Sequence, residues 1–149
     1  MQIYASNEKA RFDYEILEHF EAGLVLAGHE VKSVKRGSAS IRGAYVKILR
    51  NEAWLLGATI SPYQPDNVPA NYDLQRNRKL LLKKSELKYL IGKSQEKGLT
   101  LVPIKLYNKN GLVKLEIGIA RGKKKFEKRE KIAKREVERK IERTLKQRG

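Results

Sequence analysis

The sequence contains no cysteine, which excludes disulfide bonds and thiolate metal sites. Its two histidines, His19 and His29, have a spacing that matches no metal-binding motif. No stretch approaches the roughly 18 consecutive apolar residues that a membrane-spanning helix needs, and the first residues show no secretory signal. These absences predict a cytoplasmic protein that needs no metal ion or other cofactor.

Catalytic motifs are missing as well. The sequence has no Gly-x-Ser-x-Gly, no His-Glu-x-x-His and no glycine-rich phosphate loop. Acidic residues are plentiful from Asp13 to Glu18, but the exposed face of a strand accounts for them. We therefore expect no enzymatic activity, with a nuclease as the weaker alternative.

Basic residues dominate what is present. The chain has 33 Lys and Arg against 17 Asp and Glu, a formal net charge of +16 in 149 residues. Residues 121–149 alone contain fourteen basic and five acidic side chains, a net charge of +9. A charge of this size indicates a polyanionic partner. We interpret the partner as nucleic acid; an anionic membrane surface is the alternative.

Alternating apolar and acidic side chains from Phe12 to Ile16 predict a half-buried strand that continues less regularly to Leu26. We expect a bulge or bend at Gly23. Such a bend would turn Glu21 out of the regular alternation, where its carboxylate could accept hydrogen bonds from bases or orient an arginine. An ordinary exposed strand glutamate is the equally plausible alternative.

Turn residues and periodicity divide the rest of the chain. The predicted elements are a short helix over 28–37, a hairpin of strands 44–49 and 53–60, an irregular loop over 61–79, a helix from Ser85 to Lys97, and a hairpin of strands 99–107 and 112–120. Asn110-Gly111 suits a type I′-like turn. The pattern predicts a mainly β fold, a small antiparallel OB-like barrel with two or three embedded helices. Tyr45 and Trp54 fall on strands, and we interpret them as core or barrel surface and not as base-stacking platforms.

A basic tail, residues 122–149, follows the predicted barrel of residues 1–121. The tail has a narrow apolar stripe and several Glu–Lys pairs at i, i+4, each of which contributes only about 0.2–0.5 kcal/mol. We expect it to be mobile when free and helical when bound. Its three lysines at 123–125 can neutralise phosphates, and Phe126 could stack on an unpaired base. The alternative is that Phe126 anchors the tail on the barrel as a hydrophobic plug.

The chain carries, in this order, NEKARFDY, EAGLVLAGHEVKSVKRGSASIRGAYV, RNRKLLLKKSEL and ARGKKKFEKR. Together these segments resemble the SsrA-binding protein family, also called small protein B. The resemblance begins at Asn7, continues into the tail, and rests on the set of motifs because none is diagnostic by itself. It implies an OB-like barrel with embedded helices and a tail that is disordered in isolation.

The resemblance also implies a function. Members of this family bind transfer-messenger RNA on its tRNA-like portion and carry it to ribosomes stalled on messages without a usable stop codon, which is called trans-translation. The barrel takes the place of an anticodon arm, a form of tRNA mimicry, and the tail reaches into the empty message channel near the 16S rRNA of the decoding centre. No DNA partner is expected. The alternative function is a structural ribosomal or ribosome-assembly protein that binds rRNA.

Seven positions match family residues associated with RNA binding: Asn7, Glu21, Leu81, Lys114, Gly122, Lys123 and Lys124. Leu81 belongs to RKLLL, whose leucines could equally be core. Four tail positions are implied in ribosome binding: Phe126, Glu127, Lys128 and Arg129. Family members usually have Asp-Lys-Arg after the aromatic position, so Glu127 keeps the charge on a longer side chain.

Overall fold

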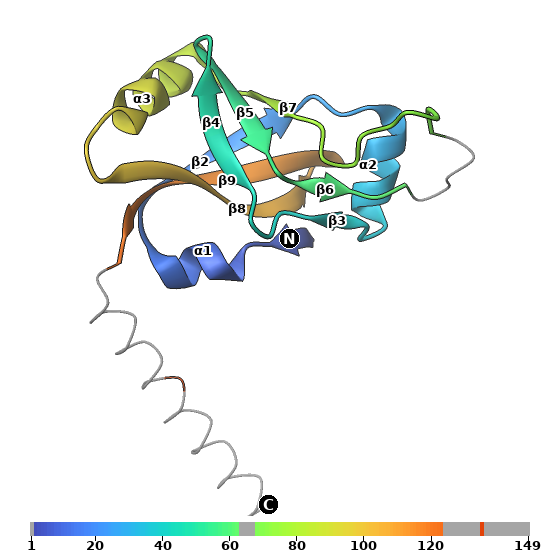
Figure 1. The fold of residues 1–149 in the computed structure, drawn as a ribbon, viewed down its shortest axis with the longest axis horizontal. Coiled ribbons are helices and arrows are strands. Elements are labelled where there is room, and N and C mark those ends of the chain that lie inside the picture. Colours follow the sequence, from blue (N-terminus) through green and yellow to red (C-terminus); the bar gives the residue numbers. More distant parts are fainter. Residues whose placement is uncertain (1, 63–67, 124–134, 136–149) are drawn as a thin grey trace, which may run out of the picture.

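The computed structural model describes residues 2–62, 68–123 and 135 (Figure 1). It confirms the mainly β fold: seven strands form one antiparallel sheet in the order β1-β8-β9-β2-β7-β5-β4, and β3 pairs with β6. The strands are β1 Ile3–Ser6, β2 Tyr14–Leu24, β3 Ala39–Ser40, β4 Tyr45–Leu49, β5 Glu52–Leu56, β6 Thr59–Ile60, β7 Arg78–Leu81, β8 Leu99–Lys109 and β9 Leu112–Gly122. The helices are α1 Glu8–Asp13, α2 Gly28–Lys35 and α3 Lys84–Ser94.

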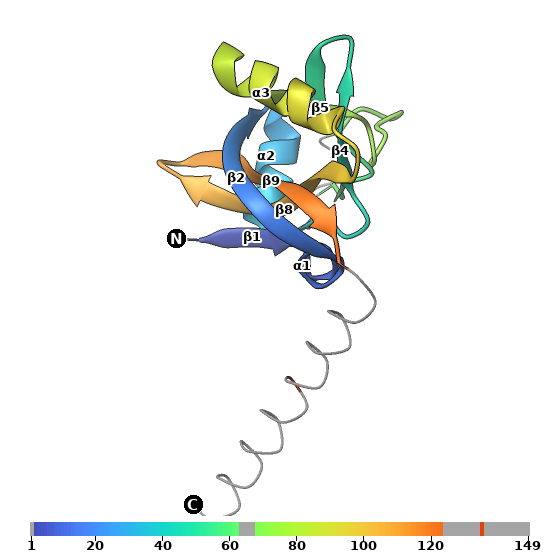
Figure 2. The same ribbon diagram turned by 90° about the vertical axis from the view of Figure 1, so that its left-hand side faces the viewer.

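The large sheet curls around the main hydrophobic core without closing into a complete barrel. Its edge strands are β1 and β4, and β4 lies against β8 with Cα atoms within 8 Å but without strand pairing. Helices α1 and α3 lie at opposite ends of the strongly twisted sheet (Figure 2). Side chains from β5, β7, α3 and β9 fill the interior, including Leu55, Leu80, Leu90, Leu115 and Ile117. The expected OB-like barrel is therefore an open one.

The N-terminal segment differs from the prediction. Phe12 and Asp13 lie in α1, and β2 begins only at Tyr14. The helix forms because Asn7 caps it: the Asn7 Oδ1 atom accepts a hydrogen bond from the Ala10 N–H at 3.2 Å. A five-residue alternation was too short to reveal a six-residue helix placed directly before a strand.

The irregularity in β2 also lies elsewhere than predicted. The register shifts between Ile16 and Glu18, whereas Gly23 pairs regularly with Leu81 on β7 and Lys114 on β9. The predicted bulge at Gly23 is therefore wrong. A Cβ atom there would make only ordinary van der Waals contacts with side chains of the two neighbouring strands.

The structure confirms most of the other predicted elements. Both hairpins and α2 are confirmed, except that the predicted strand 53–60 ends at Leu56 and Thr59–Ile60 pairs with β3 instead. The hairpin turns use left-handed residues: Arg50 and Asn51 have φ values of 52° and 61°, and Asn110 and Gly111 have 52° and 80°. Helix α3 begins at Lys84, one residue before the predicted start at Ser85. The helix also ends at Ser94 and not at the predicted Lys97.

A buried ion cluster joins α2 to β7. The side chains of Glu30 and Arg78 are both fully buried, and Arg78 Nη2 lies 2.8 Å from Glu30 Oε2. Arg76 Nε lies 3.0 Å from the same carboxylate, and the Tyr72 hydroxyl also contacts it at 3.0 Å. The other carboxylate oxygen accepts the Ala27 N–H at 2.8 Å, at the start of α2. The cluster therefore holds the segment before β7 against α2.

Candidate nucleic-acid interface

Three residues predicted for RNA binding meet on the outer face of β7, β2 and β9. Glu21 lies on β2, and Gly23, two residues along the same face, pairs with Leu81 and Lys114. A Cβ atom added to Gly23 would sit 3.5 Å from Leu81 Cβ and 3.6 Å from Lys114 Nζ. An apolar and a cationic side chain therefore both lie over Gly23, at ordinary van der Waals distance from such an atom. We call Glu21, Leu81 and Lys114 the β7–β2–β9 patch.

Leu81 is on the surface and not in the core. Its exposure is 50%, whereas that of its neighbour Leu80 is 3%. This decides between the two interpretations that its position in RKLLL left open. Beside Leu81 and Lys114 lies a shallow pocket of about 230 Å³ lined by Leu24, Leu26 and Val31, among others. Its volume is below the roughly 300–1,000 Å³ of sites for drug-sized ligands.

Glu21 is held by two donors from β8. The Tyr107 hydroxyl donates to Glu21 Oε2 at 2.5 Å, and Lys109 Nζ lies 3.1 Å from Oε1. The hydrogen bond from Tyr107, followed by that from Lys109, lowers the pKa of the Glu21 carboxyl from its ordinary value of 4.5. Burial and the hydrogen bond to Glu21 raise the pKa of Tyr107. At neutral pH the glutamate is therefore ionised and the tyrosine protonated.

Tyr107 and Lys109 are the residues that sequence reasoning missed. Tyr107 pairs with Lys114 across the β8–β9 ladder, and Glu21 pairs with Glu116 on the other side of β9. The alternation of Lys105, Tyr107 and Lys109 along one face of β8 was visible in the sequence. Their position next to Glu21 was not, because it depends on the register of three strands.

The patch combines three kinds of contact with nucleic acid. Lys114 can neutralise a phosphate, and Leu81 offers apolar surface. The Glu21 carboxylate keeps free lone pairs beyond those used by Tyr107 and Lys109, so it can accept hydrogen bonds from base amino groups or sugar hydroxyls. Its 35% side-chain exposure leaves it accessible to such donors.

We expect Tyr107→Phe to weaken RNA binding roughly two- to tenfold. Without the Tyr107 hydroxyl the Glu21 side chain is freer to rotate, and fixing it when RNA binds costs conformational entropy. The pKa of Glu21, followed by carboxyl NMR, should rise at the same time. Tyr89→Phe is the matched control, since Tyr89 donates to Glu18 at 2.7 Å on a different surface. Equal affinity of the Tyr107→Phe variant and the unchanged protein would contradict a positioning role for this hydroxyl.

The other predicted residues lie at the far end of the β2–β9 ladder. Asn7 is buried, and its side chain is used within the protein: Nδ2 donates to the Pro103 carbonyl at 2.9 Å, besides the cap on α1. Lys123 N–H donates to the Asp13 carbonyl at 2.9 Å, and its Nζ lies 3.1 Å from the Arg11 carbonyl. Any part of Asn7 in RNA binding would act through the position of α1.

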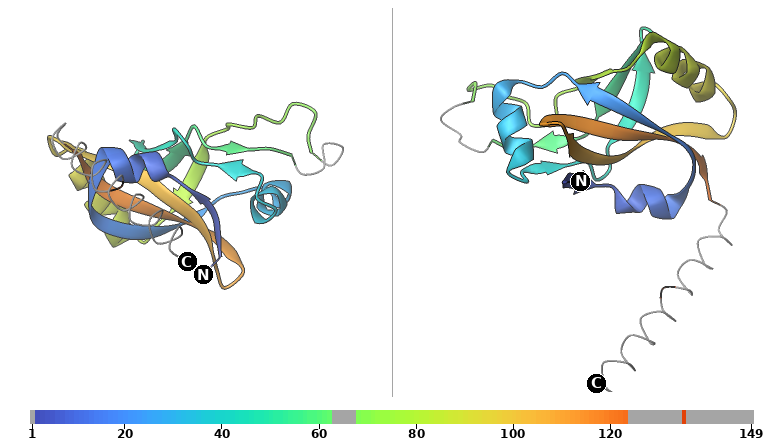
Figure 3. Two further views of the ribbon diagram at one scale, coloured as in Figure 1. Left: turned by 90° about the horizontal axis from the view of Figure 1, so that it is seen from below. Right: turned by 180° about the vertical axis from the view of Figure 1, so that it is seen from behind.

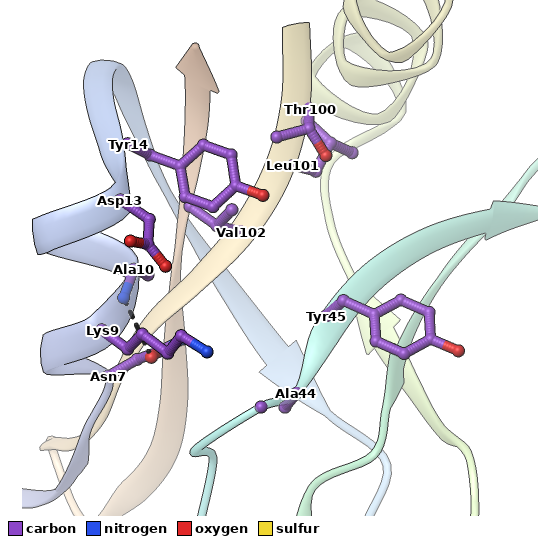
Figure 4. Close-up of a pocket in the computed structure, with 11 residues that line it drawn as sticks. Asn7, Lys9, Ala10, Asp13, Tyr14, Ala44, Tyr45, Thr100, Leu101 and Val102 are labelled. Carbon is purple, nitrogen blue, oxygen red and sulfur yellow. Dashed lines mark hydrogen bonds between the residues drawn. The ribbon is translucent and has the colours of Figure 1, made fainter. Parts of the chain in front are cut away.

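Gly122 ends β9 and pairs with Tyr14. Nothing lies within 4 Å of a Cβ atom added there, so the fold itself does not require a glycine at this position. Nearby, a pocket of about 270 Å³ opens between α1, β8 and the start of β4. The Lys9 ammonium, the Asp13 carboxylate and the Tyr14 hydroxyl surround it (Figure 4).

The predicted residues therefore form two groups and not one site. Gly23, beside the β7–β2–β9 patch, lies nine positions along β2 from Tyr14, beside Gly122. At the usual strand rise this is about 30 Å. Strands β2, β8 and β9, which connect the two groups, lie nearest the viewer in the right panel of Figure 3. Lys124, Phe126, Glu127, Lys128 and Arg129 lie outside the described residues.

Two further expectations concern absences. Among the described residues, no three His, Cys, Asp or Glu side chains gather closely enough to hold a metal ion. In the same part of the chain, no helix has both the length and the apolar character required to cross a membrane.

An antiparallel, basic β-sheet protein with a cation, an ionised acceptor and apolar surface on one face belongs to the class of nucleic-acid-binding β-sheet proteins. The model of the family described as SmpB protein matches residues 4–147. An SsrA-binding protein of Thermosynechococcus vestitus is 49% identical over 148 residues, covering 99% of this chain and 97% of the relative. One of Ruminiclostridium cellulolyticum is 50% identical over 147 residues, covering 99% and 95%. The chain belongs to the SmpB family.

A solved structure supports the same assignment. It is described as "tmRNA-SmpB: a journey to the center of the bacterial ribosome", and the matching chain has a TM-score of 0.65 and 48% identity, covering 80% of this chain and 84% of that one. The predicted resemblance is confirmed. These relatives are named for a binding partner and not for a reaction.

Proposed function

We propose that this chain binds transfer-messenger RNA and delivers it to ribosomes in the cytoplasm that have stalled on messages without a usable stop codon. The observation that carries the proposal is the β7–β2–β9 patch, where Lys114, Leu81 and a pinned, ionised Glu21 share one exposed face. Family membership supports the choice of RNA, because the relatives are SsrA-binding proteins and the solved relative is described with tmRNA and the bacterial ribosome.

The two groups of residues suit a folded RNA and not a short strand. Lys114 and Lys123 are cations near opposite ends of β9, and each can neutralise a phosphate. Gly122 offers bare backbone to which an RNA chain can come close. A partner that contacts both ends must span about 30 Å along the strand, which the elbow of a tRNA-like fold can do.

The basic tail has a separate role in this proposal. We assign the part of the tail after Lys125 to the ribosome, where it enters the vacant message channel and becomes helical against 16S rRNA. The support comes from its charge of ten basic and five acidic side chains after Lys125, and from the family resemblance of Phe126 to Arg129. In this role Phe126 stacks on a base of the decoding centre, and Glu127 replaces the shorter carboxylate common in the family.

An electrophoretic comparison at one ionic strength tests the partner. The full chain should bind the tRNA-like portion of transfer-messenger RNA at least about tenfold more tightly than a random RNA of equal length. Elongator tRNA is the matched competitor, because its elbow is similar to that of the tRNA-like portion and the rest of the molecule differs. Equal affinity for all three RNAs would overturn the proposal. Recovery of bulk rRNA as the main bound RNA in cells would favour a structural ribosomal protein.

A further inference from the structure

A row of three side chains crosses β4, β5 and β7. Lys47, Trp54 and Lys79 are direct partners in neighbouring strands, with Trp54 in the middle. The residues that alternate with them, such as Val46 and Leu55, are buried, so the row lies on the outer face of the sheet. At the usual strand spacing the row spans about 10 Å. We call it the lysine–tryptophan row.

The row is accessible and adjoins the β7–β2–β9 patch. Lys47 is exposed, the Lys79 side chain is 43% exposed, and Trp54 is half-buried. Strands β4 and β5 lie in the foreground of Figure 1, and no helix is drawn in front of them. Leu81 of the patch follows Lys79 by two residues on the same strand and face. The row and the patch therefore form one continuous surface.

Tyr45 extends this surface at its other end. It precedes Lys47 by two residues on β4 and is 52% exposed. Tyr45 also lines the pocket beside α1, with its ring on the side away from Lys9 and Asp13 (Figure 4). From the sequence alone, Tyr45 and Trp54 are interpreted as core or barrel surface and not as base-stacking platforms. The structure puts both on the surface, and the lysines on either side of Trp54 favour stacking on its ring after all. Covering the outer face of the sheet does not by itself require an aromatic ring with a lysine on either side.

Contacts within the protein account for only part of the lysine–tryptophan row. Lys79 pairs with Glu52 at 3.3 Å, and lysine stems can pack on an indole ring. Within the described residues, however, no carboxylate pairs with Lys47. A basic surface with interleaved aromatic rings is the arrangement by which proteins bind unpaired nucleotides, with bases on the rings and phosphates on the cations.

We propose that the lysine–tryptophan row binds one unstacked nucleotide of the RNA held by the β7–β2–β9 patch. The base stacks on Trp54, and Lys47 and Lys79 neutralise the phosphates on either side. This rests on the proposed function only in that the ligand is RNA. Because every base has a π-face, the contact adds affinity for an unpaired nucleotide without selecting its sequence. Lys79 exchanges its bond to Glu52 for a phosphate when RNA arrives.

Trp54 is the sole tryptophan of the chain, so its fluorescence reports on the row directly. Titrating the full chain with the tRNA-like portion of transfer-messenger RNA should quench this fluorescence with the same midpoint as the mobility shift. Trp54→Leu should weaken binding about fivefold to a hundredfold, the range for loss of a stacking aromatic. Trp54→Phe should stay within about threefold because it keeps a ring.

The two lysines have their own readout. Lys47→Ala and Lys79→Ala should each reduce the slope of log affinity against log salt by about one. Lys88→Ala, on the exposed side of α3, is the matched control and should leave the slope unchanged. Circular dichroism checks that each variant folds. If Trp54→Leu does not fold, the Trp54→Phe variant, the lysine variants and the fluorescence quenching still test the proposed nucleotide site.

Tight, selective RNA binding without quenching, together with wild-type salt slopes in both lysine variants, would overturn the row and leave the proposed function standing. Equal binding of random and tRNA-like RNA would instead count against the proposed function. Quenching by random RNA that follows its own binding midpoint would still support the row as a nucleotide site.

Discussion

Deletion of all residues after Lys125 is expected to leave affinity for the tRNA-like RNA within about threefold while abolishing ribosome rescue. The described sheet is complete before that point, because β9 ends at Gly122 and the Lys123 N–H bonds to the Asp13 carbonyl at 2.9 Å. The deleted residues carry ten basic and five acidic side chains that the proposed function assigns to ribosomal RNA. Removing them should therefore separate delivery of the RNA from its acceptance by the ribosome.

The experiment needs two assays on one preparation. Mobility shift gives the RNA affinity, and reconstituted translation of a message without a stop codon gives the yield of rescued product. A full-length variant with residues 126–149 in scrambled order is the matched control, since it keeps the charge and loses the sequence. Parallel loss of RNA affinity and rescue in the truncated chain would refute the division of labour. Full rescue by the scrambled variant would show that charge alone suffices.

Glu30→Ala is expected to reduce the free energy of unfolding by about 3–5 kcal/mol, because it leaves the fully buried Arg78 without its carboxylate. It also removes the acceptor of the Ala27 N–H at the start of α2. Urea denaturation followed by circular dichroism measures the loss. Glu52→Ala is the matched control, since its ion pair with Lys79 is exposed and should contribute at most about 1 kcal/mol.

A pH series makes the same cluster testable without loss of contacts. Burial by itself would raise the pKa of the Glu30 carboxyl, but hydrogen bonds from Arg76, Ala27 and Arg78 outweigh it and lower the pKa to about 2. Below pH 4.5 the unfolded chain takes up a proton that the folded chain does not. The contribution of Glu30 is therefore complete above pH 4.5 and is lost as the pH falls to about 2.

That contribution amounts to about 3 kcal/mol. Glu30→Gln should remove the part of the pH dependence that this group causes, and Glu52→Gln should not. A Glu30→Gln variant whose stability falls with acid as steeply as that of the unchanged protein would contradict the assignment. Because the cluster lies between α2 and the segment before β7, its loss should also weaken RNA binding at the nearby Leu81.

Local features of the fold were predictable because their causes are local. Asn110-Gly111 specified its turn through residues that accept positive φ, and from Val113 to Ile119 apolar side chains of β9 alternate with Lys114, Glu116 and Gly118. Helix α1 was missed because its signal, the Asn7 cap, is indistinguishable from the start of a turn in a short segment. Gly23 was misread because a glycine that pairs regularly within a strand and a glycine at a bulge look alike in sequence.

For the candidate site, the sequence predicted which residues take part but not how they are arranged. Family resemblance named Glu21, Leu81 and Lys114. The two residues that hydrogen-bond to Glu21 are Tyr107 and Lys109, and they come from a strand more than eighty residues away in the sequence. The burial of Asn7 and the exposure of Leu81 likewise depend on which face of each element meets the core. These properties are set by strand register, which is a relation between distant segments.

By itself, the sequence determined the net charge, the absence of cysteine chemistry, the turns and the alternation of individual strands, since each is a property of residues or short segments. The tertiary structure alone decided that one face would join β7, β2 and β9, and that Lys47, Trp54 and Lys79 would stand in line. A shift of one residue in any ladder would turn those side chains to the opposite face, and burying the apolar face of every strand fixes the register that prevents it.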